Sequence, residues 1–193
     1  IDINNPKKDA ELIAKAYNIP IEFNKKCLEE AKSLPDNLEN EPLEFDRIDL
    51  RDLKTITIDG ADSKDFDDAI SVEKLKDGYK IGVHIADVSH FVDIGSALDR
   101  EARKRGNSVY LIDKVYPMFP HELSNGICSL NEGVSRFAMT VFINIDNKGN
   151  IRESSFHKSV IKSDRRLTYD YAQDILDKIE EDEEWLKKLL TEA

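Results

Sequence analysis

Ten residues, Asp59 to Asp68, carry five aspartates and one lysine and separate two segments with the pattern of β-strands. Two carboxylates about 4 Å apart at a protein surface repel by roughly 4 kcal/mol at an effective dielectric constant of about 20. A folded loop that gathers several carboxylates therefore needs a compensating positive charge. The stretch also constrains the fold, because carboxylates fixed at two strand ends can converge on one point.

The residues on either side of this stretch favour strands that end and begin at its aspartates. Thr55-Ile56-Thr57-Ile58 runs directly into Asp59, and Asp67-Asp68 runs directly into Ala69-Ile70-Ser71-Val72. Phe66 interrupts the acids, and we expect its ring to anchor the loop inward. The alternative is an Asp-rich surface turn that stays hydrated.

A divalent cation is one source of the compensating charge. The stretch contains neither His nor Cys, so its donors are hard oxygens, which favour Mg²⁺, Mn²⁺ or Ca²⁺ over Zn²⁺. Spacing excludes an EF-hand, because counting from Asp59 places Ala61 third and Lys64 sixth. The calcium loop has Asp or Asn and then Gly at those positions.

The stretch Thr57-Ile58-Asp59-Gly60-Ala61-Asp62-Ser63-Lys64-Asp65-Phe66-Asp67-Asp68-Ala69-Ile70 resembles the catalytic aspartate motif of the ribonuclease R and ribonuclease II (RNB) family of exoribonucleases. The resemblance is strongest to the ribonuclease R branch and runs from about Asp46 to about Leu176. Further stretches follow in the order typical of the family, at residues 82–92, 105–110, 117–120, 123–131 and 166–170. One acidic loop alone is a weak signal, whereas ordered motifs are specific.

The resemblance implies a hydrolytic, processive 3′-to-5′ exoribonuclease that releases nucleoside 5′-monophosphates from single-stranded RNA. It places four aspartates at the catalytic and metal-coordinating positions: Asp59, Asp65, Asp67 and Asp68. Asp62 falls between these positions and is left out. The implied cofactor is Mg²⁺, with Mn²⁺ also possible. Two ions roughly 3.5 to 4 Å apart can activate the attacking water and stabilise both the transition state and the departing 3′-oxygen.

Two tyrosines are candidate substrate-binding residues by the same resemblance. Tyr110 is expected near the terminal nucleotide, and Tyr169 is expected to do similar work. Aromatic stacking holds a single strand without sequence preference and contributes about 1 to 3 kcal/mol per base. Apart from the resemblance, each tyrosine would be read as a half-buried packing residue.

The charge distribution bears on a nucleic-acid partner. The formal net charge of -11 argues against RNA at first, because affinity for phosphate backbones comes largely from Lys and Arg. Residues 1–79 carry 12 basic and 20 acidic side chains, residues 80–166 carry 13 and 10, and residues 167–193 carry 3 and 9. The middle of the chain is therefore basic, and metal binding would reduce the negative charge near the aspartates.

The expected fold class is α+β, an RNB-type catalytic domain fragment with antiparallel strands packed by helices. Residues 1–45 are expected to form a helical segment and acidic linker before the catalytic domain, and residues 46–193 its N-terminal portion. Hydrophobic spacing predicts helices at residues 6–17, 24–33, 95–105, 168–180 and 185–190. Alternation and turn residues predict strands at 55–58, 69–72, 81–86, 137–145 and 151–161, and an irregular segment at 36–52.

Several residues have ordinary structural explanations. His84 and His90 are expected to be hydrogen-bonded structural groups, with Ile81, Val83 and Ile85 on the opposite face of the strand from His84. Cys27 and Cys128 fit no metal or redox spacing and are expected to be reduced packing residues. Arg47 and Arg51 are expected to pair with acids of the 36–52 segment. The basic residues at 100–105 either form a solvated helix face or contact phosphate.

The chain lacks an apolar run of about 20 residues and the regions of a signal peptide, so no membrane partner and a cytoplasmic location are expected. It has no initiator Met, which suggests a fragment lacking the rest of the catalytic domain and the flanking OB-fold RNA-binding domains. We expect the isolated chain to bind metal weakly and to degrade RNA slowly or not at all. The alternatives are a catalytically inactive RNA-binding relative and another Mg²⁺-dependent phosphoryl hydrolase, such as a phosphomonoesterase.

Overall fold

Two units, each assembled from separate stretches of sequence, make up the chain. The computed structural model describes residues 9–35, 37–38, 43, 46–111, 114–178 and 182–192. The first unit combines Ile1–Pro35 with Val88–Gly126, and the second combines Asp36–Asp87 with Ile127–Ala193. The expected domain boundary after residue 45 stays a prediction. In the part that the structure describes, every helix is too short or too polar to cross a membrane.

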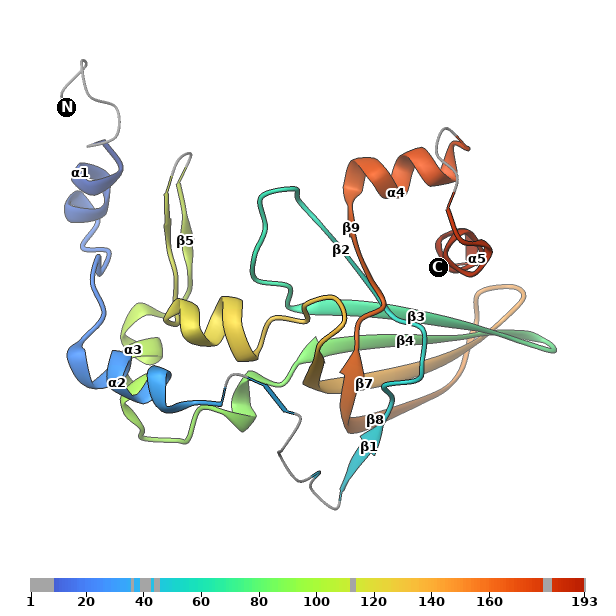
Figure 1. Ribbon diagram of the computed structural model, residues 1–193, viewed down its shortest axis with the longest axis horizontal. Helices are drawn as coiled ribbons and strands as arrows, with labels where there is room; N and C mark the ends of the chain where they lie inside the picture. The colour runs from blue at the N-terminus through green and yellow to red at the C-terminus, as the bar shows by residue number, and fades with distance from the viewer. Residues whose placement is uncertain are drawn as a thin grey trace. The chain divides into compact units, whose positions relative to one another are not determined.

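The first unit is mainly helical (Figure 1). It contains α1 (Asp9–Ala16), α2 (Lys25–Ser33), α3 (Ala97–Arg105), the 3₁₀ turn η2 (Val88–His90) and the antiparallel pair β5 (Val109–Tyr110) and β6 (Val115–Tyr116). The distorted helix η3 (Glu122–Ile127) follows. The predicted helices at 24–33 and 95–105 are confirmed, and that at 6–17 is confirmed from residue 9, because residues 6–8 lie outside the described part.

Capping residues explain where α2 and α3 begin and end. The Asn24 side chain accepts hydrogen bonds from the backbone N–H groups of Lys26 and Cys27, and the Ser96 side chain accepts one from Asp99. These caps satisfy N–H groups that have no partner inside the helix. Gly106 ends α3 with φ 79°, a conformation that favours glycine.

Arg105 is a structural residue of the first unit. Its side chain is almost fully buried, pairs with Glu101 at 3.0 Å and lies with its guanidinium carbon 3.7 Å from the centroid of the Phe23 ring. It also donates to the carbonyl oxygens of Pro20 and Pro117, both at 3.1 Å. Of the basic residues at 100–105, Arg105 is therefore committed to the interior instead of to solvent or phosphate.

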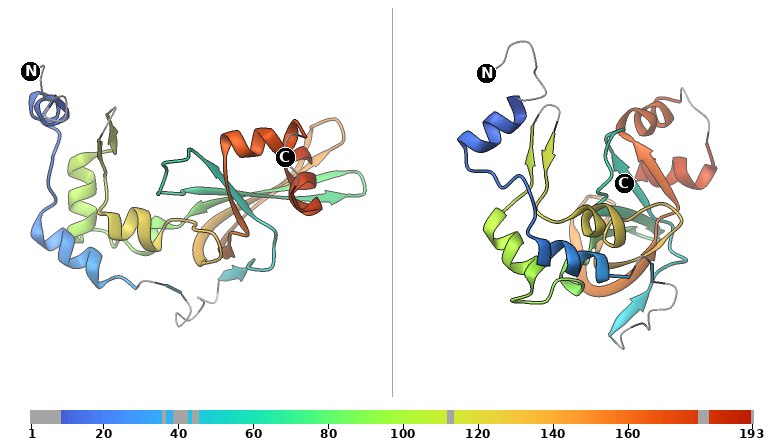
Figure 2. Two further views of the ribbon diagram at one scale, coloured as in Figure 1. Left: turned by 45° about the horizontal axis from the view of Figure 1, so that its top comes forward. Right: turned by 60° about the vertical axis from the view of Figure 1, so that its left-hand side comes forward.

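The second unit is built on a seven-stranded sheet (Figures 1 and 2). Its order is β1-β8-β7-β4-β3-β2-β9, and only the two edge pairs, β1 with β8 and β2 with β9, are parallel. The helices α4 and α5 follow the last strand along the chain. The expected α+β class with mostly antiparallel strands is confirmed. The strands and helices are β1 (Arg47–Asp49), β2 (Ile56–Asp59), β3 (Asp68–Leu75), β4 (Gly78–Ala86), β7 (Ser135–Asp146), β8 (Ile151–Lys162), β9 (Arg165–Thr168), α4 (Tyr169–Leu176) and α5 (Glu184–Glu192).

Strand β1 corrects the expectation that residues 36–52 are irregular throughout. Its three residues pair with β8, with Arg47 opposite Lys158. Arg51 pairs with Asp49 of the same segment as expected, but Arg47 pairs at 2.9 Å with Asp87, beyond the end of β4. Three residues are too few for alternation to show in the sequence, so tertiary hydrogen bonds alone define this strand.

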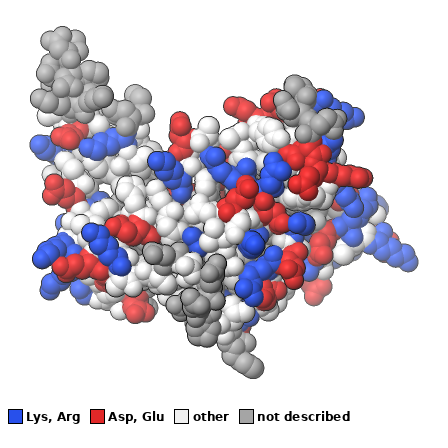
Figure 3. Space-filling model, viewed as in Figure 1, with Lys and Arg blue, Asp and Glu red and all other residues white. Residues whose placement is uncertain are grey.

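Charged side chains of both signs lie interspersed on the face that Figure 3 shows. The ion pairs of the second unit include Arg51 with Asp49, both of them exposed, and Lys54 with Asp164, of which Lys54 is exposed. Such exposed pairs contribute only about 0 to 1 kcal/mol each. Surface ion pairs of this kind therefore do little to hold the fold together, which depends on the packing beneath them.

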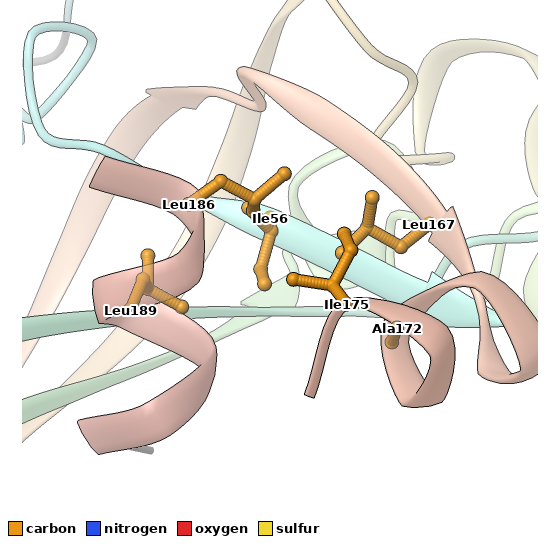
Figure 4. Close-up of a cluster of buried hydrophobic side chains, with 6 residues drawn as sticks. All are labelled: Ile56, Leu167, Ala172, Ile175, Leu186 and Leu189. Atoms are coloured by element: carbon orange, nitrogen blue, oxygen red, sulfur yellow. The ribbon is translucent and has the colours of Figure 1, made fainter. Parts of the chain in front are cut away.

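Helices α4 and α5 pack over β2 and β9 through an apolar cluster (Figure 4). Partly buried residues of β3, Ile70 and Val72, extend this cluster along the sheet. The predicted helix at 185–190 is confirmed, whereas the one predicted at 168–180 ends at Leu176, because Lys178 adopts a positive φ of 61°. The buried residues of the cluster are Ile56, Leu167, Ala172, Ile175, Leu186 and Leu189.

The opposite face of the sheet buries a row of hydrogen-bonded polar side chains across β3, β4, β7 and β8. His84 Nε2 lies 3.0 Å from Ser71 Oγ, and His84 Nδ1 lies 2.8 Å from Thr140 Oγ1. Thr140 Oγ1 lies 2.6 Å from Ser159 Oγ, which donates to the Ala138 carbonyl. The structural role expected for His84 is confirmed. Since these groups are buried, their mutual hydrogen bonds offset the cost of removing them from water.

Gly82 leaves the space that the His84 ring and the Ser71 hydroxyl occupy. A Cβ atom at this position would lie 2.3 Å from Ser71 Oγ and 2.8 Å from His84 Nε2. On the other face of β4, Ile85 is 44% exposed. The apolar residues of this strand thus face the less covered side, because the polar row already fills the interior side.

Burial lowers the pKa of His84 to about 4, and its hydrogen-bond partners Ser71 and Thr140 are uncharged. It also raises the pKa of Cys27 to about 11 and that of Cys128 to about 12, so both buried thiols stay protonated. The two cysteines are free, as expected. His84 therefore binds a proton at a higher pH in the unfolded chain than in the folded chain.

We predict that His84 makes the chain less stable as the pH falls from about 6.5 to about 4. The unfolded imidazole, with a pKa of about 6.5, takes up a proton that the folded one excludes. The difference from a folded pKa of about 4 corresponds to a loss on the order of 3 kcal/mol below that pH. Urea unfolding at a series of pH values measures it.

In that series, His84→Gln is expected to remove this part of the pH dependence of stability. His121 is exposed, so His121→Gln is the control and should show the same pH dependence as wild type. Equal pH dependence in wild type and His84→Gln would contradict the prediction.

Candidate active site

The aspartate loop, residues 59–68, joins β2 to β3 in the second unit. Asp59 is the last residue of β2 and Asp68 is the first residue of β3, which confirms the strand ends expected from the sequence. β2 and β3 are antiparallel neighbours, paired at Ile56 and Ile70. The loop therefore connects two adjacent strands, and the sheet fixes the backbone of the aspartates at both of its ends.

Phe66 anchors the middle of the aspartate loop, as expected. Its side chain is buried, and its backbone N–H donates to Ser129 Oγ at 3.0 Å. Its carbonyl accepts from the Leu130 N–H at 2.9 Å, and Ser129 Oγ donates to the Lys64 carbonyl at 3.1 Å. The segment at 129–130 thus holds the loop at Lys64 and at both backbone groups of Phe66.

The end of the loop is tied to the end of β4. The Asp67 carbonyl accepts from the Ala86 N–H at 2.8 Å. Asp87, the next residue, donates its backbone N–H to the Phe137 carbonyl and accepts from Arg47 with its carboxylate. Both side chains of that ion pair are almost completely buried, so removing one partner would leave a buried charge at this point.

Arg166 of β9 contacts the beginning of the loop. One terminal nitrogen of its guanidinium donates to the carbonyl oxygens of Gly60 and Ala61, at 3.1 and 2.8 Å. The guanidinium carbon lies 5.1 Å from the centroid of the Phe66 ring. The backbone N–H of Arg166 donates to Glu132 at 2.7 Å, which fixes the strand from its other side.

The carboxylates of the loop act on one another electrostatically. The pKa of Asp59 is raised overall. Desolvation is the largest cause, the charges of Asp68 and Asp65 add to it, and the charge of Arg166 offsets part of it. The pKa of Asp67 is raised first by desolvation, although the residue keeps exposed surface, and then by the charges of Asp65, Asp68 and Asp59. In both cases burial is the larger cause of the raised pKa, and the negative charge of the neighbouring carboxylates adds to it.

The donor chemistry of the loop fits a hard divalent cation, since carboxylate oxygens that repel one another are stabilised by a positive charge between them. The side chains themselves are not gathered around a common point. Among the residues that the structure describes, no three His, Cys, Asp or Glu side chains are placed to hold a metal ion together. The backbone thus brings four candidate ligands to one loop, and their assignment as ligands stays a prediction.

The two candidate tyrosines lie in different units. Tyr169 is the first residue of α4 and follows Thr168, which pairs in register with Asp59 across β9 and β2. Tyr110 is the last residue of β5 in the first unit. Their side chains are 64% and 65% exposed, so neither is the half-buried packing residue of the alternative interpretation. Their contact with a substrate stays a prediction.

Two residues that hold the aspartate loop, Ser129 and Arg166, were not singled out from the sequence as site residues. Both lie inside stretches that resemble family motifs, at 123–131 and 166–170, and this was the available signal. Their contacts with the loop join residues more than sixty positions apart, which no local pattern reveals.

The comparisons with known proteins agree with this fold. The RNB domain family matches residues 47–192, so the chain belongs to the RNB family. Within that family it is similar to ribonuclease R: it is 49% identical over 179 residues to the Thermotoga maritima protein of that name. The match covers 91% of this chain and 25% of the Thermotoga protein, so the chain spans about a quarter of that relative's length.

Solved structures show the same fold. Mycoplasma genitalium RNase R in complex with ribose methylated single-stranded RNA superposes with a TM-score of 0.90 at 34% identity, covering 97% of this chain and 29% of that one. Yeast Ssd1, described as a pseudonuclease, shares the fold at 22% identity with a TM-score of 0.66, covering 76% of this chain and 19% of that one. The fold therefore occurs in proteins with and without nuclease activity.

We predict that Ser129→Ala destabilises the chain by about 1 to 3 kcal/mol, because the buried Phe66 N–H loses its acceptor. The free energy of unfolding in urea measures the effect. Ser154→Ala, at an exposed position of β8, is the matched control and should change stability by no more than about 0.5 kcal/mol. Equal stabilities for the two variants would show that Ser129 does not anchor the loop.

Proposed function

We propose that this chain is part of the catalytic domain of a hydrolytic 3′-to-5′ exoribonuclease that releases nucleoside 5′-monophosphates from single-stranded RNA. The observation that carries the proposal is the aspartate loop, whose mutually repelling carboxylates stand between two strands of an RNB-family sheet. Membership of the family supports phosphodiester hydrolysis as the reaction. The 3′-to-5′ polarity and the processivity rest on the family resemblance.

We propose Mg²⁺ as the cofactor, with Mn²⁺ as a substitute, held by the four aspartates of the family motif. A bound pair of such ions would activate the attacking water and stabilise the departing 3′-oxygen. The chain's own part is to fix the backbone of the loop that carries the carboxylates. Those aspartates are Asp59, Asp65, Asp67 and Asp68.

Single-stranded RNA is the proposed substrate, and the Mycoplasma relative solved with single-stranded RNA supports this choice. In the second unit, the exposed Tyr169 ring next to the β2–β9 pair offers a surface for base stacking. Stacking contributes about 1 to 3 kcal/mol per base and does not depend on sequence. Tyr110 is proposed to contact the terminal nucleotide in the complete enzyme.

An RNA-binding protein without nuclease activity is the second candidate. It is favoured by one observation: the described side chains are not gathered into a metal site. The retention of all four motif aspartates favours the nuclease, because a protein that only binds RNA gains nothing from their repulsion. A phosphomonoesterase using the same carboxylates is the third candidate, and its small-ester substrates distinguish it.

The chain alone is proposed to bind metal weakly and to degrade RNA slowly or not at all. It spans about a quarter of the length of Thermotoga ribonuclease R. We propose that the complete enzyme supplies the remainder of the catalytic domain and flanking RNA-binding domains. A cytoplasmic location is also proposed, and the two free, buried cysteines are consistent with a reducing compartment.

The test is a chimera in which this chain replaces its matching segment of Thermotoga maritima ribonuclease R. With Mg²⁺ and a 5′-labelled single-stranded RNA, the chimera is expected to release mononucleotides step by step from the 3′ end. In the chimera, Asp67→Asn should reduce the rate by about a hundredfold or more, since losing one charged group that stabilises the transition state costs about that much.

Asp62→Asn is the matched control, because Asp62 lies in the same loop but outside the four motif positions, and it should keep nearly the full rate. RNA binding without cleavage by the chimera would support the inactive relative instead. Release of phosphate from small esters would support the phosphomonoesterase.

A further inference from the structure

We propose that Arg166 is a positioning residue that sets the conformation of the aspartate loop for metal binding. That Arg166 orders the loop stands on its contacts alone, whereas the consequence for a metal ion rests on the proposed function.

Arg166 reaches the loop from a neighbouring strand. β9 runs parallel to β2, and Arg166 is paired with Thr57, two residues before Asp59. From there its guanidinium extends past the end of β2 and donates to the consecutive carbonyl oxygens of Gly60 and Ala61. A charged donor shared by two adjacent carbonyls fixes the direction in which the chain turns away from Asp59.

The same guanidinium acts on two further parts of the loop. Its carbon atom lies 5.1 Å from the centroid of the buried Phe66 ring, so it links the start of the loop to its middle. Its positive charge acts on Asp59 against the charges of Asp68 and Asp65. One side chain therefore orients the backbone at the first aspartate and reduces the repulsion there.

Ser129 comes from a different segment than Arg166 and contacts different atoms of the loop, the Phe66 N–H and the Lys64 carbonyl. Arg166 acts on another part of the loop, the segment between Asp59 and Ser63. The Gly60 carbonyl that accepts from Arg166 also accepts from the Ser63 N–H at 3.1 Å, which closes the first turn of the loop. Loss of Arg166 should loosen this turn and leave the sheet intact.

Arg165 provides a matched control on the same strand. Its guanidinium pairs with Asp182 at 2.9 and 3.1 Å and with Glu183 at 3.8 Å, so it is directed at acids near α5. Arg165→Met and Arg166→Met each remove one positive charge from β9 and make the same change in side-chain volume. A general effect of losing an arginine from this strand would therefore affect both variants.

The experiment measures amide hydrogen exchange by NMR in wild type, Arg166→Met, Arg166→Lys and Arg165→Met of the 193-residue chain. The readouts are the hydrogen-bonded amides of Ser63 and Phe66, and the Val83 amide of the central strand β4 reports on the fold as a whole. Arg166→Lys keeps the charge, so it serves as the second variant if Arg166→Met does not fold.

Arg166→Met should speed exchange at Ser63 and Phe66 by about tenfold or more, the effect of losing a charge-assisted hydrogen bond. Arg166→Lys should fall between it and wild type, and Arg165→Met should match wild type. Unchanged exchange in Arg166→Met would overturn the proposal. So would equal acceleration at Val83, because that result would make Arg166 a general stabiliser of the sheet.

Mn²⁺ titration of the same variants tests the link to the metal, followed by paramagnetic broadening of the loop amides. Weaker binding in Arg166→Met than in wild type and Arg165→Met supports the link, and equal binding overturns it. If the wild-type loop shows no broadening at all, the proposed metal site fails. The exchange result would then still decide whether Arg166 orders the loop.

Discussion

Repulsion among carboxylates on one short loop is the constraint that the second unit must accommodate. The sheet holds the two ends of the loop through β2 and β3. Between them the backbone is held by Arg166 at its start, by Ser129 around Phe66 and by Ala86 at its end. All of these contacts are made to backbone atoms of the loop and not to its carboxylate groups.

This division of roles suits a site that binds a charged ligand. Ordering a flexible loop costs conformational entropy, and a loop that is already ordered avoids that cost at the moment of binding. The buried polar row contributes to the same end, because His84 pairs in register with Ala69, the residue after Asp68. The interior hydrogen bonds of the sheet therefore fix the strand on which the last aspartate of the loop stands.

The sequence was most informative where local pattern and charge coincide. It predicted the strand ends at Asp59 and Asp68 and the inward anchor at Phe66, because alternation, charge and an isolated aromatic residue are visible in a few neighbouring positions. It did not reveal the hydrogen bonds of Ser129 or Arg166 to the loop. Those contacts depend on which strands become neighbours, and that is decided by the packing of the whole sheet.

Other differences have the same origin. Arg47 was expected to pair with nearby acids, yet it is buried against Asp87 because β1 pairs with β8. The apolar side of β4 faces the less covered surface, since Gly82 and His84 belong to a polar interior that alternation cannot distinguish from an exposed face. Hydrophobic pattern thus identified the strands but not the contents of each face.

The most direct test of the account is an anomalous difference map from crystals of this chain soaked in Mn²⁺. The account predicts anomalous density within bonding distance of the carboxylate oxygens of the four motif aspartates, with the backbone of the loop unchanged. Mn²⁺ found only at other acidic side chains, with none bound by the loop carboxylates, would contradict it.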